Sequence, residues 1–160
     1  SVIIEAAKLL KGKVLGLIGA DTFQSFKDDW STEQKEAFLN SFKTNFVATA
    51  KGFVKGMFPA SADTSLVKRV VEKMSQAPPQ VAVSAMRNLF YYDPLPILKQ
   101  TDLPIISINC DMYPVSIEEN EKYVKSFEVK LMKGVGHFVM LENPKEFNSY
   151  LYDAINELTQ

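Results

Sequence analysis

The chain has 160 residues, 46% of them apolar and 23% charged, which matches an average globular domain and excludes a disordered chain. Its 18 basic and 19 acidic residues give a net charge of −1 without a basic stripe, so nucleic acid is not an expected partner. The single cysteine, Cys110, excludes an internal disulfide and fits a reducing compartment such as the cytoplasm, and no apolar run reaches the roughly 18 to 20 residues of a membrane span.

The first elements are a helix and a strand. Apolar residues at helical spacing predict an amphipathic helix over residues 2–11, with Ser1 able to cap it and Gly12 able to end it. The nearly continuous apolar run at 13–19 predicts a strand buried on both faces, as in parallel sheets covered by helices. Asp21 follows this strand at its carboxyl end, where open α/β sheets place their sites.

A long helical block follows, with no further convincing strand before residue 98. Its internal signals are a capping-box-like start at residues 31–34, a second helix start at Asp63 and a break at the two prolines 78 and 79. Phenylalanines recur through the block at spacings of mostly three, four or seven, which is typical of packed helices.

Alternation of strands and helices returns after the block. Residues 103–109 and 127–132 predict two more strands, with a short acidic helix over 116–126 between them. Asp111 lies just past the second strand and His137 just past the third, and Asn-Pro at 143–144 starts a closing helix. Right-handed crossovers on a parallel sheet would place the loops after all three strands on one edge, so Asp21, Asp111 and His137 can converge.

His137 is the only histidine and the first candidate for proton transfer near neutral pH. The alternative is an ordinary histidine on a loop. With one histidine and no set of ligands at suitable spacing, no metal site is expected, and nothing points to a cofactor. Cys110 is not expected to be a nucleophile, because the neighbouring carboxylate of Asp111 would raise the pKa of its thiol.

Three segments carry a resemblance to a known family. They are Gly-Val-Gly-His-Phe at 134–138, Leu-Glu-Asn-Pro at 141–144 with Phe147 behind it, and the strand and acid loop at 104–114. Together they resemble the C-terminal half of an α/β-hydrolase, with the helical block where that family inserts a cap. The resemblance implies an α/β fold of about three parallel strands with flanking helices, plus an inserted all-helical cap. The implied domains are residues 1–21 and 99–160 for the hydrolase part and 22–98 for the cap.

The resemblance also implies acyl transfer or a related displacement, with His137 as general base and an aspartate as its partner. Asp111 follows the strand that usually supplies the acid and is preferred, while Asp21 is the alternative acid used by some members. The family more often places the acid at the position that Tyr113 occupies here, and either aspartate could simply stabilise a turn.

The chain contains no nucleophile motif. A nucleophile elbow reads Gly-x-Ser-x-Gly after a strand, and that pentapeptide does not occur; Ser1 lacks the glycine two residues later. We therefore expect the chain to be a piece of a hydrolase that is inactive alone, with the N-terminal half of the hydrolase domain as its missing partner. The first strand would then have an unpaired outer edge. The oligomeric state stays open.

Aromatic side chains offer a place for the substrate. Trp30, Phe138, Tyr91 and Tyr92 could line an apolar site, and the two tyrosines could donate hydroxyl protons, although core packing explains aromatic residues at helical spacing equally simply. The predicted function is a serine-type hydrolase of small or medium apolar esters, amides or related substrates. The alternative is a non-catalytic α/β-hydrolase-like protein that acts as a small-ligand receptor or a regulatory binding module.

Overall fold

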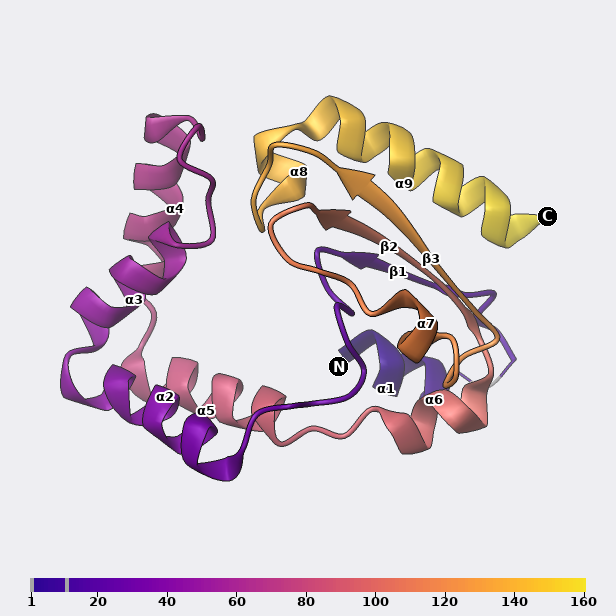
Figure 1. The fold of residues 1–160 in the computed structure, drawn as a ribbon, viewed down its shortest axis with the longest axis horizontal. Coiled ribbons are helices and arrows are strands. Elements are labelled where there is room, and N and C mark those ends of the chain that lie inside the picture. The colour runs from indigo at the N-terminus through magenta and orange to yellow at the C-terminus, as the bar shows by residue number, and fades with distance from the viewer. Residues whose placement is uncertain (1, 11) are drawn as a thin grey trace. The chain divides into compact units, whose positions relative to one another are not determined.

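The structure is a computed structural model that describes residues 2–10 and 12–160. The chain divides into two compact units, with Ser1–Lys27 and Asp93–Gln160 in unit 1 and Asp28–Tyr92 in unit 2 (Figure 1). Residues 22–27 and 93–98, which the sequence places in the cap, thus belong to unit 1. The predicted helix cap at Ser1 lies outside the described residues.

Unit 1 contains a three-stranded sheet, as predicted. Its strands are β1 (Leu17–Ala20), β2 (Pro104–Cys110) and β3 (Ser126–Met132), all parallel and in the order β1-β2-β3. The first strand begins later than predicted, after Gly16. A side chain at Gly16 would lie 2.5 Å from Leu158 Cδ2 and 2.9 Å from the carbonyl oxygen of Pro104, so the chain needs glycine to pass here.

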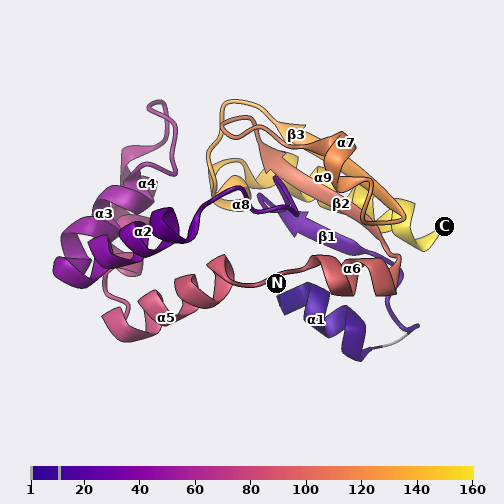
Figure 2. The ribbon, with the colours of Figure 1, turned by 60° about the horizontal axis from the view of Figure 1, so that its bottom comes forward.

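Helices cover both faces of this sheet. They are α1 (Val2–Leu9), α6 (Leu95–Thr101), α7 (Ile117–Asn120), α8 (Val139–Glu142) and α9 (Pro144–Thr159). Helix α9 lies on one face, whereas α1 and α6 lie on the other (Figures 1 and 2). The predicted start of α9 is confirmed, since Asn143 Oδ1 accepts the N–H of Glu146 and Pro144 occupies the first turn.

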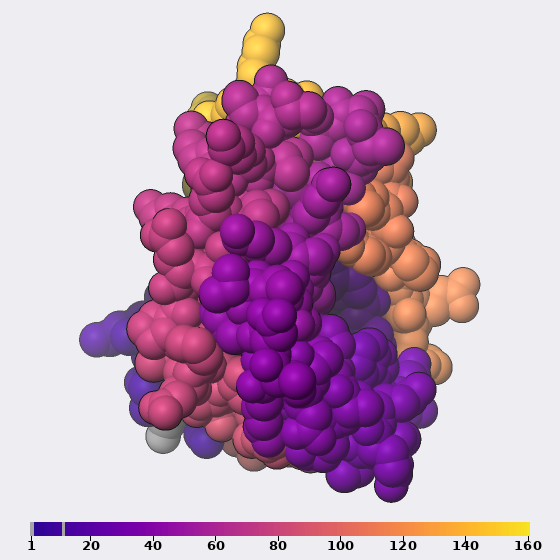
Figure 3. Space-filling model, turned by 90° about the vertical axis from the view of Figure 1, so that its left-hand side faces the viewer, coloured from indigo at the N-terminus to yellow at the C-terminus, as the bar shows by residue number. Residues whose placement is uncertain are grey.

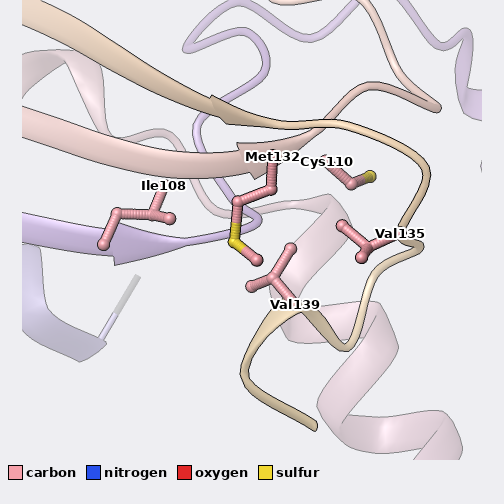
Figure 4. Packing of buried hydrophobic residues seen from close by; sticks show 5 residues of the cluster. All are labelled: Ile108, Cys110, Met132, Val135 and Val139. Atoms are coloured by element: carbon pink, nitrogen blue, oxygen red, sulfur yellow. The ribbon is translucent and has the colours of Figure 1, made fainter. Parts of the chain in front are cut away.

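A buried apolar cluster fixes the loop that follows β3. Its members are Ile108, Cys110, Met132, Val135 and Val139, and all five are less than one tenth exposed. Figure 4 shows Met132 beside Val139, so the residues after β3 fold back onto the sheet. The loop that carries His137 is thereby packed against the ends of β2 and β3.

One edge of the sheet is formed by β1 and the other by β3. Within the described residues β1 pairs with β2 alone, as expected for the first strand. Large apolar side chains nearby in the sequence are also open to solvent: Val2 and Leu9 of α1 are 80% exposed and Leu15 is 63% exposed. An unpaired strand edge and exposed apolar side chains together are typical of a surface that another element covers.

Unit 2 is a helical unit. It contains α2 (Thr32–Thr44), α3 (Phe46–Lys55), α4 (Thr64–Ser75) and α5 (Pro79–Phe90). The predicted capping box of α2 and the predicted cap of α4 are confirmed, because the Ser31 hydroxyl oxygen accepts the N–H of Gln34 and Asp63 Oδ1 accepts that of Leu66. Figure 3 shows the surface of this unit, with α2 (purple) next to α5 (pink).

Aromatic side chains contact one another across the helices of unit 2. Phe38 contacts Phe42, Phe53 and Phe90 with ring centroids 5.2 to 5.4 Å apart, and Phe42 also contacts Phe46. Tilted and edge-to-face pairs of this kind stabilise a core beyond the area that they bury. These phenylalanines therefore serve packing.

Candidate active site

His137 lies in a loop whose backbone is held by two carboxylates. Glu142 accepts the N–H of Gly136 at 2.9 Å with Oε2 and the N–H of Phe138 at 3.2 Å with Oε1, so it binds the peptide groups on both sides of His137. Asp111 Oδ1 accepts the N–H of Gly134 at 3.1 Å. Gly134 has a φ of 70°, in the left-handed region that glycine adopts without strain. The loop therefore has a defined shape.

Asp21 stands at the carboxyl end of β1 and is buried. Its backbone N–H donates to the carbonyl oxygen of Ile108 at 2.8 Å, and its Oδ1 accepts the N–H of Cys110 at the same distance. Its φ is 44°, a left-handed conformation that aspartate adopts more readily than most residues. The main chain of β2 thus anchors both the backbone and the carboxylate of Asp21.

Asp21 and His137 form a close pair. Nδ1 of His137 is 2.6 Å from Oδ2 of Asp21, and the two residues are 116 positions apart. The Asp21 side chain is fully buried, whereas that of His137 is 39% exposed. An ionised carboxylate can only accept, so a neutral imidazole must carry its proton on Nδ1 and leave the lone pair of Nε2 available as a base. This is the geometry of a general base held by an acid.

The carboxylate that contacts His137 is that of Asp21 and not that of the preferred Asp111. Which of the two acts as the acid stays a prediction. Asp111 lies at the same edge of the sheet, and its N–H donates to the carbonyl oxygen of Met132 at 3.1 Å. Its side chain bonds the loop backbone at Gly134 instead of the imidazole. The convergence of the three loops is confirmed, but the carboxylate that reaches the ring comes from β1.

Cys110 packs against the same carboxylate. Burial, first, and the hydrogen bond to the Asp21 carboxylate, second, raise the pKa of the Cys110 thiol to about 11. The thiol is therefore protonated near neutral pH and poorly suited to attack a substrate. The cause differs from the one expected from the sequence, since the responsible carboxylate is Asp21 and not Asp111.

Phe138 is the predicted substrate residue that lies next to His137. The two rings meet edge to face, with centroids 5.3 Å apart and an interplanar angle of 75°. Phe138 is partly buried, so it presents an apolar surface beside the imidazole. This contact limits the orientations that the His137 ring can take.

The other three predicted substrate residues belong to unit 2. Trp30 is 48% exposed and stacks on Phe90, with ring centroids 5.6 Å apart. The Tyr91 hydroxyl donates to Glu36 Oε1 at 2.8 Å, so this proton is already engaged, and Tyr92 is partly buried. Their engagement with a substrate stays a prediction.

Glu36 gives unit 2 a testable dependence on pH. Its carboxylate binds the guanidinium of Arg87 at 2.5 and 2.8 Å, and the hydrogen bonds of Arg87, first, and of Tyr91 lower its pKa to about 2 from the usual 4.5. A pKa lowered by folding means stability that is present above pH 4.5 and is lost as the pH falls toward 2. We expect Glu36→Gln to melt lower than wild type at pH 7 and to lose less of its melting temperature between pH 4.5 and 2.

Circular dichroism melts of both proteins across that range measure the effect. Glu72→Gln, at an exposed glutamate of α4, is the control and should keep the wild-type dependence. Equal acid sensitivity of Glu36→Gln and wild type would show that this cluster does not stabilise unit 2.

Sequence reasoning missed the polar residues that support the pair. Ser107, Asn109 and Asn120 are wholly buried and bond the loop after β1, and Glu142 holds the His137 loop. The usable signal was the alternation at 105–109, where serine and asparagine stand two positions apart inside an otherwise apolar strand. Polar side chains buried at such positions require hydrogen-bond partners.

The described residues form neither a group of metal ligands nor a membrane-spanning helix. Over residues 2–10 and 12–160, no three or more histidine, cysteine, aspartate or glutamate side chains are grouped so as to hold a metal ion. In the same part of the chain, no helix combines the length and the apolar character needed to cross a membrane.

Comparison of the sequence with known proteins gives no match, either to a family model or to a curated protein. Comparison of the structure finds similar solved structures. A hydrolase from Oleispira antarctica, olei00960, aligns with 97% of this chain at a TM-score of 0.76 and 15% identity. The esterase EaEST from Exiguobacterium antarcticum aligns with 97% at a TM-score of 0.73 and 15% identity. A bromoperoxidase from Bacillus anthracis aligns with 95% at a TM-score of 0.70 and 18% identity.

The chain spans 61 to 63% of the length of these three structures. Their identities are too low to carry a substrate or an activity over, but the TM-scores establish a common architecture. The three parallel strands, the flanking helices and these alignments show that the chain has the α/β-hydrolase fold and corresponds to a part of it.

Proposed function

We propose that this chain supplies the general base and its acid partner to a serine-type hydrolase of small or medium apolar esters, amides or related substrates. The observation that carries the proposal is the 2.6 Å contact between His137 Nδ1 and the buried carboxylate of Asp21. The names of the similar structures, a hydrolase and an esterase among them, support the same class of reaction.

In this proposal Nε2 of His137 takes the proton of the nucleophilic hydroxyl as its oxygen attacks the substrate carbonyl carbon. Asp21 keeps its proton-free state and stabilises the imidazolium that forms. Nε2 then gives the proton to the leaving group as the carbon to leaving-group bond breaks. In the second half of the cycle Nε2 takes a proton from a water molecule, whose oxygen attacks the acyl carbon. The bond between that carbon and the nucleophile oxygen then breaks, Nε2 returns the proton to this oxygen, and the acid is released.

The nucleophile and the oxyanion hole are proposed to come from sequence outside these 160 residues. Two observations support this: no Gly-x-Ser-x-Gly occurs in the chain, and β1 pairs on one side only within the described residues. Further strands of the same sheet would cover that edge and the exposed Val2, Leu9 and Leu15.

The direct test is hydrolysis of p-nitrophenyl esters of increasing acyl length by the full-length protein, meaning this chain together with any sequence that precedes it in the natural protein. We expect burst kinetics and loss of activity after treatment with a serine-directed phosphonate. Binding of such esters without any turnover would contradict the hydrolase and favour the receptor alternative.

A second measurement tests where the nucleophile lies. Recombinant protein limited to residues 1–160 should not turn over an activated ester above the rate of free imidazole. Hydrolysis by that protein at a rate abolished in its His137→Ala variant would show that the chain holds a nucleophile of its own.

A further inference from the structure

The loop from Asp21 to Phe26 has an unusual backbone. Asp21 has a φ of 44° and Phe23 a φ of 61°, and neither is glycine. Aspartate visits the left-handed region with modest strain, but a bulky residue such as phenylalanine does so rarely. Surrounding contacts must therefore impose this conformation on the loop.

Two buried side chains of β2 bind the start of the loop. Ser107 and Asn109 are two positions apart, so they point to the same face of the sheet. Asn109 Nδ2 donates to the carbonyl oxygen of Thr22 at 3.1 Å. The Ser107 hydroxyl lies 2.7 Å from that oxygen and 2.5 Å from Asn109 Oδ1, so its single proton can serve either one.

Asn120 of α7 binds the rest of the loop with both ends of its amide. Its Nδ2 donates to the carbonyl oxygen of Phe23 at 2.8 Å, and its Oδ1 accepts the N–H of Phe26 at 2.8 Å. The Asn120 residue is wholly buried. One amide therefore spans the loop and fixes the carbonyl of Phe23, whose backbone is in the left-handed region.

The bound segment begins directly after the residue that pairs with His137. Thr22, whose carbonyl oxygen Asn109 binds, directly follows Asp21 in the chain. Asn109 therefore restrains the peptide between Thr22 and Phe23, which is the next peptide after the one that joins Asp21 to Thr22. A shift of this peptide would pass through the Thr22 backbone to Asp21, whose carboxylate must reach both the Cys110 N–H and His137 Nδ1. A change in the loop backbone would therefore be felt at the imidazole.

We propose that Asn109 and Asn120, together the amide clamp, are positioning residues that hold the Asp21 loop in its left-handed conformation and so aim the carboxylate at His137. The catalytic consequence of this proposal rests on the proposed function. A purely structural role for the two amides predicts a loss of stability and no change at the imidazole. The two accounts therefore differ at His137.

The test is a histidine-selective ¹⁵N spectrum of the full-length protein, recorded at a pH where the His137 ring is neutral. The spectrum of His137→Gln identifies the His137 resonances. Wild type should show the tautomer with the proton on Nδ1. In Asn120→Ala we expect a mixture of tautomers, together with a kcat that is about 100-fold lower at a KM unchanged within about twofold, as for a misplaced catalytic group.

Asn109→Ala is the second variant, should Asn120→Ala not fold. The control is Ile4→Val, which removes a buried methyl group from unit 1 without touching a hydrogen bond of the loop. It should leave the tautomer and kcat unchanged.

A folded clamp variant that keeps the wild-type nitrogen shifts of His137 overturns the proposal, whatever its stability. The hydrolase assignment can fail separately. A wild-type protein that hydrolyses no ester, but whose His137 tautomer changes in Asn120→Ala, would exclude the hydrolase and retain the clamp.

Discussion

Replacement of His137 by alanine should lower the kcat of the full-length protein for an activated ester by about 10⁴-fold, with little change in KM. The variant removes the group that takes the proton from the nucleophile in the transition state, which is worth about 5 kcal/mol at this rate ratio. Steady-state kinetics at saturating p-nitrophenyl ester measure the loss.

A matched control keeps this result specific to the imidazole. Lys133→Ala changes an exposed residue of the same loop and should leave kcat within about twofold of wild type, as most surface substitutions are nearly neutral. Turnover near the wild-type rate in a folded His137→Ala variant would remove the hydrolase assignment.

Exchange of each aspartate for asparagine should separate the two candidate acids. Asp21→Asn keeps the size of the side chain but removes the negative charge 2.6 Å from Nδ1, so we expect kcat to fall by about 10⁴-fold. Asp111→Asn retains an oxygen that can accept the N–H of Gly134, and it should lower kcat by less than about tenfold.

The comparison is made on kcat for one ester, with thermal melts to show that both variants are folded. A severe loss in Asp111→Asn together with normal turnover in Asp21→Asn would reverse the assignment of the acid. It would also mean that the loops rearrange when the substrate binds.

The sequence predicted the parts of the site that local pattern determines. Three apolar runs gave three parallel strands, and the polar residue after each run marked one edge of the sheet, where Asp21, Asp111 and His137 do converge. Capping residues located helix starts to within a residue at Ser31, Asp63 and Asn143.

Other features depend on contacts between distant segments and left no local pattern. The two aspartates follow similar strands, and the left-handed backbone at Asp21 with the Cys110 N–H on its carboxylate determines which one reaches the ring. Asn120 looks like any residue of a short polar helix until the loop after β1 is placed on it. The resemblance to the family favoured Asp111. A resemblance of local motifs carries no information on these contacts, so it did not distinguish the two aspartates by their surroundings.

The position of Asp21 at the end of β1 links assembly of the sheet to the proposed role of Asp21 as the acid partner of His137. This strand has four residues and one neighbour within the described part of the chain, so it is the strand most prone to fraying. An element that pairs with its free edge lowers the entropy of the strand and, through it, of the carboxylate 2.6 Å from the imidazole. Pairing of another strand at that edge would therefore stabilise the contact between Asp21 and His137. Loss of this pairing would weaken the contact without a change in either residue.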